Sequence, residues 1–477
     1  MFINQLDKKR MIIKNYIKQI DYFNLSLILL SISLGLYQIT IGESHPDFNS
    51  LHWLIDIRFF DLLIHFSTAD GLYGGFYPPL YFILAKLHGE IFGYSLISFR
   101  LLSLVAYFFT IIFIRNKFYQ LTNIRDNKSL YLLLLFIITS PTFIYSAQTA
   151  KYTMWLTLIS IMGVTYGLIF LQKRDIRSGF FLAIILTIMI YTHYFSTIFS
   201  FSIMFIMFIN GIFKKDKLFL KNSIIVSLIT FFLIIPILIV QYKAYILRLS
   251  EPYFFQDTET FYYVTRIIKG IIIESIFGIG FIKEYTFSNL LKEKVINKDT
   301  ILLLIGSFSI LIVFYYYVYA VRHDRVLKTK FLYFGGIFFL IIFICKLINI
   351  RISFQYIHAL TFCIFITFIM ILNKFQFKRF ILFPIIVVLS FNLYSLTNYY
   401  NNKKNIYFGI ETIENYLKGI QYNHDIYIHD WIEYSTGNYE YNDHYNYISS
   451  LKELVSTEIG NKNLIFYFGS PNLVKDN

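Results

Sequence analysis

Long apolar segments recur along almost the whole chain and leave few folds open to it. Of the 477 residues, 56% are hydrophobic and 20% aromatic, which is more apolar than a soluble globular protein of this length. Eleven segments come close to the roughly 20 residues that a helix needs to cross a bilayer. They are residues 23–41, 96–114, 129–147, 152–171, 179–194, 195–213, 222–241, 301–321, 331–350, 354–373 and 380–397. The sequence therefore predicts an all-α polytopic membrane protein with about 11 transmembrane helices.

The positive charge of the chain is concentrated in alternate loops. The net charge is +14, which by itself would also fit a nucleic-acid-binding protein. If the basic tail 1–22 is cytoplasmic, the tail and the loops on its side contain 23 basic and six acidic residues, and the rest of the chain has a net charge of −3. Such an excess in cytoplasmic loops is typical of inner-membrane proteins. We therefore expect a multi-pass protein of the inner (plasma) membrane with a cytoplasmic N-terminus and no nucleic-acid partner.

Two further apolar segments are better placed on the membrane surface than across it. Counting Tyr81–Phe92 as a span would invert every later loop and move the basic clusters outside. In Val264–Phe281, three charged residues interrupt the apolar run at intervals that suit a helix lying in the headgroup plane. We predict an interfacial helix in each of the outer loops 42–95 and 242–300.

The tail, residues 398–477, differs in character from the preceding transmembrane domain, residues 23–397. It contains helix-like and strand-like stretches in alternation, at residues 409–418, 425–430, 448–459 and 463–468. Tyrosines crowd the connection between the two strand-like stretches. The pattern predicts a small extracytoplasmic α/β domain.

Carboxylates near the outer membrane surface are the first candidates for chemistry. A sugar attached to a lipid phosphate is already activated, so an inverting transfer mainly needs a carboxylate to accept the acceptor's proton and positive groups to hold the leaving phosphate. Asp47 follows the first span by six residues and opens the amphipathic run 50–66, which would hold it at headgroup depth. The same position also suits a solvated acid at a helix N-terminus. Asp47 is the first candidate for the catalytic base, and Glu43 is the second.

A series of motifs follows Asp47 in a recognisable order. They are Tyr77-Pro78-Pro79-Leu80-Tyr81, Phe92-Gly93 and Arg100-Leu101-Leu102-Ser103. In order and spacing the series resembles the first outer loop of the GT-C glycosyltransferases, specifically the protein O-mannosyltransferase and aminoarabinose-transferase-like family. The resemblance implies the GT-C fold, a polyprenyl-phosphate-linked sugar donor and a catalytic role for Asp47. Family members often have Asp-Glu at this site, whereas Phe48 follows Asp47 here.

Two later segments extend the resemblance. Ser140-Pro141 and the stretch Tyr145–Tyr152 are similar to the family's Ser-Pro and Tyr-Ser-Gln-Glu-Ala-Arg-Met-Tyr, and Thr192-His193-Tyr194 matches a Thr-His-Tyr of many relatives. Thr149 stands where the family has its second acid, and Lys151 where it has an arginine. The resemblance implies a set of donor-binding residues, namely Lys151, Arg351, Arg100, His193 and Tyr81.

Several of these residues also have a purely structural interpretation. Lys151 and Arg351 lie at the ends of spans, where long basic side chains reach toward the headgroups. A single histidine at the end of a span, such as His193, commonly forms structural hydrogen bonds. The sequence leaves both interpretations open.

The predicted function is that of an inverting hexosyl- or pentosyltransferase. Its partners would be a polyprenyl-phosphate-linked sugar, the bilayer and a glycan, lipid or protein acceptor. No His, Cys, Asp or Glu cluster has the spacing of metal ligands, so neither a metal nor another cofactor is predicted. One alternative is an O-antigen-polymerase-like glycan ligase, which does not share the order of motifs. Another is a polysaccharide flippase or transporter, which would favour charges in mid-span and inverted repeats.

Overall fold

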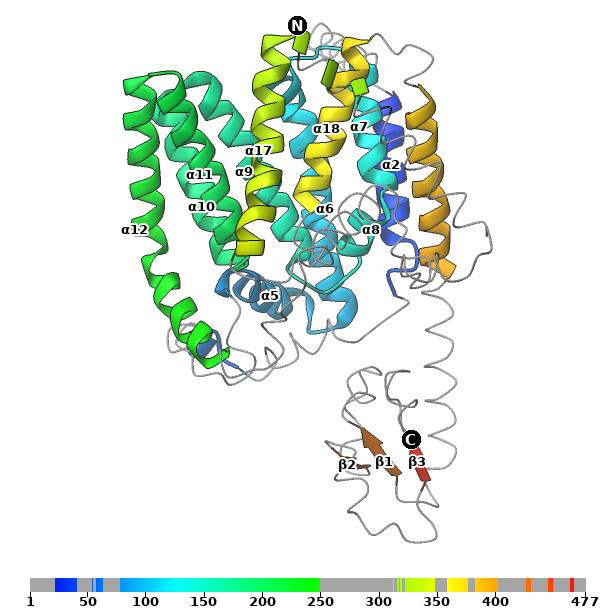
Figure 1. The fold of residues 1–477 in the computed structure, drawn as a ribbon. Helices are drawn as coiled ribbons and strands as arrows, with labels where there is room; N and C mark the ends of the chain where they lie inside the picture. The colour runs from blue at the N-terminus through cyan, green and yellow to red at the C-terminus, as the bar shows by residue number, and fades with distance from the viewer. Residues whose placement is uncertain are drawn as a thin grey trace, which may run out of the picture.

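The computed structural model is a bundle of helices that run between two ends (Figure 1). It describes residues 22–40, 78–248, 322–347, 358–375 and 382–401, the strands of the tail, and single positions within 54–62 and 312–319. The helices are α2 (Tyr22–Leu36), α5 (Pro79–Phe92), α6 (Leu96–Thr122), α7 (Asn127–Thr139), α8 (Pro141–Ala147), α9 (Thr153–Lys173), α10 (Ile176–Thr192), α11 (Ser196–Phe213), α12 (Lys217–Arg248), α17 (Arg325–Leu347), α18 (His358–Lys374) and a last helix, Leu382–Asn401.

The predicted spans coincide with these helices, apart from 301–321, of which only scattered positions are described. Among the described residues, six helices are long and apolar enough to cross a membrane by themselves, and the bent pair α7 and α8 would make a seventh. The helices α2, α10 and α18 are apolar but shorter. The structure therefore confirms a polytopic, mainly helical membrane protein.

The predicted span 129–147 is two helices instead of one. α7 ends at Thr139, α8 starts at Pro141, and the two meet at an angle of 61°. The proline ring disfavours helical backbone at the preceding residue, and Ser140 is accordingly extended, with ψ of 120°. Most side chains of α8, which follows the break, are buried.

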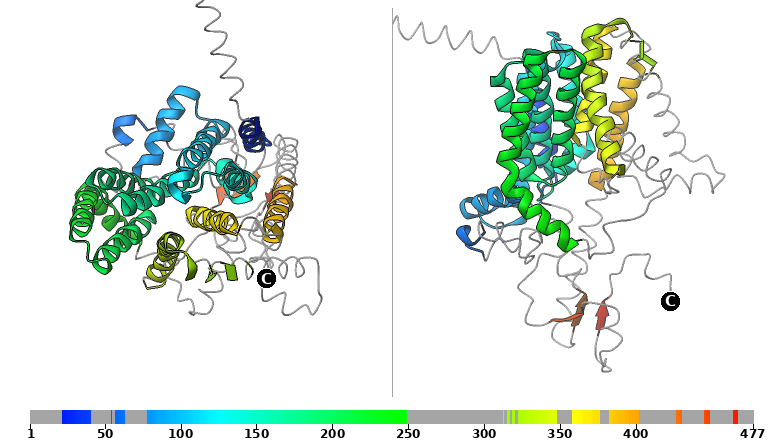
Figure 2. Two further views of the ribbon diagram at one scale, coloured as in Figure 1. Left: turned by 90° about the horizontal axis from the view of Figure 1, so that it is seen from above. Right: turned by 60° about the vertical axis from the view of Figure 1, so that its left-hand side comes forward.

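α5 lies across one end of the bundle, as predicted for Tyr81–Phe92 (Figures 1 and 2). Pro79 occupies its first turn, where the missing N–H costs no hydrogen bond. Gly93 ends it with a φ of 87°, a conformation that favours glycine. The second predicted interfacial segment, Val264–Phe281, lies outside the described residues.

Aspartates start the helices at the opposite end of the bundle. Their carboxylates accept hydrogen bonds from backbone N–H groups at the beginning of α7, α10, α12 and α17. The four aspartates are, in the same order, Asp126, Asp175, Asp216 and Asp324. A negative charge is favourable there because it caps the open N–H groups and meets the positive end of the helix dipole. Four of the six acids that the charge pattern assigns to this side thus have a local structural role.

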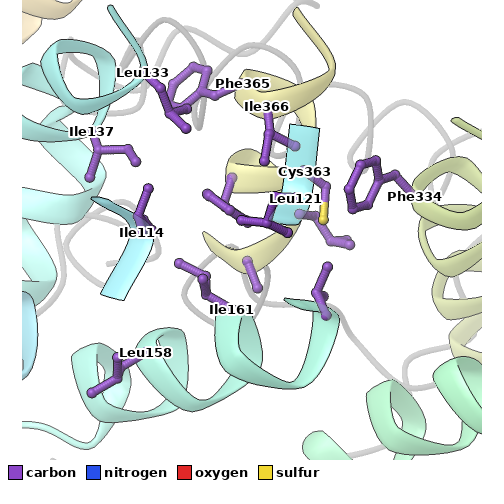
Figure 3. Close-up of a cluster of buried hydrophobic side chains, with 14 of the residues drawn as sticks. Ile114, Leu121, Leu133, Ile137, Leu158, Ile161, Phe334, Cys363, Phe365 and Ile366 are labelled. Carbon is purple, nitrogen blue, oxygen red and sulfur yellow. The ribbon is translucent and has the colours of Figure 1, made fainter. Parts of the chain in front are cut away.

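α9 forms the centre of the bundle and packs against α6, α8, α10, α11 and α18. Most of its side chains are buried. Figure 3 shows where apolar side chains of α6, α7, α9, α17 and α18 meet in the core: Ile114, Leu121, Leu133, Ile137, Leu158, Ile161, Phe334, Cys363, Phe365 and Ile366.

Three short strands are described in the tail: β1 (Ile426–His429), β2 (Tyr445–Ile448) and β3 (Leu464–Phe466). They form a parallel sheet in the order β2-β1-β3. β1 and β3 fall within the two predicted strands, whereas β2 lies in the tyrosine-rich connection, where no strand was predicted. The predicted helix 409–418 and most of 448–459 lie outside the described residues.

The contact between α9 and α17 leads to a stability prediction. Tyr333 on α17 donates a hydrogen bond to the carbonyl of Val164 on α9 (2.9 Å), and its hydroxyl occupies the space that a Cβ at Gly167 would need. We expect Gly167→Ala to lower the free energy of unfolding by about 1–3 kcal/mol through overpacking, measured by thermal unfolding in detergent. Gly163→Ala is the control, because its nearest neighbours lie at ordinary distances of 3.6–3.7 Å. Equal losses in both variants would contradict the prediction.

Candidate functional site

The α5 end of the bundle brings together the segments that the sequence singles out. α2, α10, α17 and the last helix end there, and α6, α9, α11 and α18 begin there (Figure 1). The described candidates Tyr81, Arg100, Lys151 and His193 all lie at this end. Asp47, Glu43 and Arg351 lie outside the described residues, in connections whose flanking helices end or begin here: 41–77 after α2, and 348–357 between α17 and α18.

A row of three aromatic rings crosses this end of the bundle. Tyr152 stacks on His193, with ring centroids 4.6 Å apart and 25° between the planes. Tyr152 also makes an edge contact with Tyr81 of α5, with ring centroids 6.2 Å apart. The row thus joins α5, the start of α9 and the junction of α10 and α11. Tyr81 and His193 are buried, and Tyr152 is half-buried.

The backbone sets the tautomer of His193. The N–H of Phe195 donates to His193 Nδ1 at 3.1 Å. An imidazole nitrogen that accepts a hydrogen bond carries no proton, so the proton of the neutral ring is on Nε2. His193 therefore presents a donor at Nε2.

Lys151 lies beside this aromatic row, in the short connection between α8 and α9. The connection is held at both ends: Thr149 Oγ1 donates to the carbonyl of Ser146, and Ser103 Oγ of α6 donates to the carbonyl of Lys151, both at 3.2 Å. Lys151 itself is half-buried. An ammonium group held at this depth can attract a phosphate as a point charge.

Arg100 is deeply buried and binds the protein's own backbone. Its side chain is 2% exposed, and Nη1 donates to the carbonyl of Ile39 at 2.7 Å. Ile39 belongs to the turn that follows α2, eight residues before Asp47. This contact favours a role in placing the start of the first outer loop.

Lys86 of α5 anchors the same loop on the far side of Asp47. Its Nζ donates to the carbonyl of Leu54 at 2.8 Å, pairs with Glu90 at 2.8 Å and lies over the Tyr94 ring. Burial alone would lower the pKa of Lys86, but hydrogen bonds with Glu90 and Tyr94 outweigh it and raise the pKa above its usual value. The hydrogen bond from Lys86 lowers the pKa of Glu90. Each partner thus favours the charged form of the other. The segment that contains Glu43 and Asp47 is therefore tied to the bundle at Ile39 and at Leu54.

Gln148 also lies at this end of the bundle. It belongs to the motif Tyr145–Tyr152, but it was not among the predicted site residues. Its Nε2 contacts three carbonyls at the end of α2, those of Leu34, Gly35 and Tyr37, at 3.2, 3.0 and 2.8 Å. Its Oε1 accepts a hydrogen bond from the hydroxyl of Tyr399 in the last helix (3.0 Å). The sequence signal that could have identified it is a glutamine that directly follows an apolar span.

His358, the first residue of α18, is a second residue that the sequence missed. It is 1% exposed, and its Nδ1 lies 3.1 Å from Ser146 Oγ and 3.4 Å from Thr157 Oγ1. Its ring stacks on Phe143 of α8. These contacts fix the start of α18 against α8 and α9, seven residues after Arg351.

Aromatic rings, basic side chains and hydrogen-bond donors gather at this end of the bundle. Among the described residues, no group of three or more His, Cys, Asp or Glu side chains is arranged to hold a metal ion. The described part of this end thus places a half-buried lysine, Lys151, beside the row of rings.

Two solved structures resemble the chain over most of its length. One is the crystal structure of ArnT from Cupriavidus metallidurans bound to undecaprenyl phosphate, with 10% identity, 91% of this chain and 87% of that chain covered, and a TM-score of 0.50. The other is the same protein in the apo state, with 10% identity, coverages of 90% and 86%, and a TM-score of 0.51. No family model and no curated protein sequence matches the chain. At this identity the match shows the fold alone, and it confirms the predicted GT-C fold.

The hydrogen bonds of Gln148 allow a test of how the end of α2 is held. We expect Gln148→Leu to lower the free energy of unfolding by about 1–3 kcal/mol, because it leaves buried carbonyls without their donor while nearly conserving volume. Thermal unfolding in detergent measures the change. Gln172→Leu, at an exposed position of α9, should have little effect. If the two variants unfold alike, the amide of Gln148 does not hold α2.

Proposed function

We propose that the chain is an inverting membrane glycosyltransferase that moves a hexose or pentose from a polyprenyl-phosphate carrier to an outer-face glycan, lipid or protein. The observation that carries this proposal is its ArnT-like fold over nine-tenths of the chain, because that ArnT was crystallised with undecaprenyl phosphate. The motifs that resemble the family support it, since their described residues gather at one end of the bundle.

In this proposal Asp47 is the general base. It accepts the proton of the acceptor's nucleophilic group as that group attacks the anomeric carbon of the sugar. The bond between this carbon and the phosphate oxygen breaks, and its electron pair leaves with the polyprenyl phosphate. Because attack and departure occur on opposite faces of the sugar, the configuration inverts. Glu43 is the alternative base in the same segment.

Positive groups at the same end would stabilise the leaving phosphate. Lys151 is held beside the ring row, and Arg351 precedes the anchored start of α18 by seven residues. Charge that is placed where negative charge develops stabilises the transition state at little reorganisation cost. His193 Nε2 and the Tyr81 hydroxyl supply further polar groups. Arg100 contributes indirectly by holding Ile39 at the start of the loop.

The same proposal fixes an orientation. The basic loops opposite α5 face the cytoplasm, and the α5 end faces outward, where the acceptor is found. The tail follows the last helix, which ends on the α5 side (Figure 1). It would therefore lie where it can cap the site or engage the acceptor.

The catalytic proposal predicts that Asp47→Asn abolishes transfer while membrane insertion is unchanged. The substitution keeps the shape of the side chain and removes the proton acceptor, which typically costs about 10²–10⁴ in rate. The loss should reach the upper part of this range because Thr149 replaces the family's second acid. Sugar transfer from a polyprenyl-phosphate donor, followed in membranes with equal amounts of each variant, measures it.

Glu43→Gln is the matched control for Asp47→Asn. It removes a carboxylate four residues away in the same tethered segment and should retain most activity. Loss in Glu43→Gln together with normal transfer in Asp47→Asn would move the base to Glu43. Normal transfer in both variants would refute the catalytic proposal.

The phosphate-binding roles predict a separate effect on donor affinity. Lys151→Ala and Arg351→Ala should each weaken binding of the polyprenyl-phosphate donor about tenfold or more, as expected for the loss of a charge-assisted contact. Lys128→Ala, an exposed lysine at the opposite end of the bundle, should leave affinity unchanged. If all three variants bind the donor equally well, Lys151 and Arg351 do not bind its phosphate. Their side chains then only extend toward the lipid headgroups.

A further inference from the structure

A cavity of about 600 Å³ opens at the end of the bundle opposite α5. It lies between the last turns of α6, the last turns of α9 and the start of α10, far along each helix from the proposed catalytic end. Its lining includes Lys117, Tyr166, Lys173, Asp175, Arg177 and Phe181. None of these residues has a part in the proposed transfer reaction.

The charged groups of the cavity favour an anion. Three cations, Lys117, Lys173 and Arg177, come from three different helices. The carboxylate in the lining, Asp175, caps α10 by accepting a hydrogen bond from the N–H of Ser178 at 2.7 Å. That bond, with further contacts, lowers the pKa of Asp175, so it stays ionised and offsets one of the three positive charges.

Lys117 differs from an ordinary surface lysine of this face. It is half-buried, and its Nζ lies over the ring of Tyr166, 5.5 Å from the centroid. Arg115, two residues earlier on the same helix, is exposed and does not line the cavity. Residues two apart on a helix point in different directions. If these charges only set the orientation in the membrane, Lys117 and Arg115 would not need to differ in their surroundings.

A row of aromatic rings lies one helical turn deeper than the cations. Phe113, Tyr166 and Phe181 follow one another from α6 over α9 to α10, with successive ring centroids 6.3 Å apart. Phe113 precedes Lys117 by four residues, and Phe181 follows Arg177 by four, so each ring is about 6 Å further from the bundle end than its cation. Phe181 is 56% exposed. The site is thus cationic near the bundle end and aromatic one helical turn deeper.

We propose that this cavity binds an anionic phospholipid of the leaflet opposite the catalytic end. The lipid phosphate lies among Lys117, Lys173 and Arg177, and its glycerol and first acyl carbons pack on Tyr166 and Phe181, the two rings of the row that line the cavity. Basic pockets on the cytoplasmic side of membrane proteins bind anionic headgroups. Aromatic rings prefer the interface between membrane and water. A soluble phosphate would use only the cations and would leave the row of rings uncovered. The bound lipid clamps α6 to α10 across α9.

Native mass spectrometry of the delipidated, full-length protein tests the proposal. Phosphatidylglycerol should bind more tightly than phosphatidylethanolamine. Lys117→Gln should weaken phosphatidylglycerol binding about fivefold, as expected for one basic group near an anionic surface, while Lys117→Arg keeps it. Arg115→Gln, the matched control, should bind as the parent protein does. No preference for the anionic lipid, or equal effects of Lys117→Gln and Arg115→Gln, would overturn the proposal.

A second measurement separates a lipid from a soluble anion. Phe181→Ala should weaken phosphatidylglycerol binding and lower the gain in Tm that this lipid gives by binding the folded state. Inorganic phosphate at millimolar concentration should give no comparable gain in Tm. If phosphate stabilises the protein as well as phosphatidylglycerol does, and Phe181→Ala changes neither effect, the cavity is an anion site and the lipid assignment is wrong. Neither result depends on glycosyl transfer.

Discussion

In the hydrocarbon core of a bilayer, every carbonyl that a helix end leaves open must find a donor inside the protein, because hydrocarbon offers none. At the end of α2, several carbonyls accept hydrogen bonds from other parts of the protein. Gln148 reaches the carbonyls of Leu34, Gly35 and Tyr37, Tyr400 donates to Leu34, and Arg100 donates to Ile39. These donors come from the α8–α9 connection, the last helix and α6. Satisfying one helix end thus joins distant parts of the chain and places the start of the loop that contains Asp47.

The two ends of the bundle use polar residues in different ways. At the end opposite α5, aspartates cap the helices and two of them also pair with bases, Asp216 with Arg174 and Asp324 with Lys374. These are local contacts or contacts between adjacent loops. At the α5 end, polar side chains instead bind backbone from distant segments, as Lys86 does at Leu54 and Gln148 does at α2. The first arrangement holds helix starts and neighbouring segments together, whereas the second fixes the segments that flank the proposed site.

Sequence reasoning succeeded wherever one physical rule dominated. The predicted spans matched helices because a bilayer admits few alternatives to a long apolar helix. Charge asymmetry predicted that α5 is not a span, and α5 lies across one end of the bundle (Figure 1). The reasoning failed at Pro141, where a continuous apolar run concealed a 61° break, and at β2, whose residues were assigned to a loop. At Pro141 local backbone geometry outweighed the average composition of the segment, and at β2 the pairing with β1 did. The roles of Asp47, Glu43 and Arg351, which lie outside the described part of the chain, stay predictions, and so do the donor-binding roles of Lys151, Arg100, His193 and Tyr81.

The sequence by itself determined the membrane-spanning architecture, the side on which the basic loops gather, and the set of motifs that mark the α5 end. These follow from hydropathy, charge and residue order, which are properties of short segments. Only the tertiary structure decided that Tyr81, Tyr152 and His193 form one row, that Gln148 and His358 are anchors, and that Lys117, Lys173 and Arg177 line one cavity. Each of these depends on which helices are neighbours. In a bilayer that choice is made by close packing and hydrogen bonding between helices, because apolar faces pack against lipid and protein almost equally well.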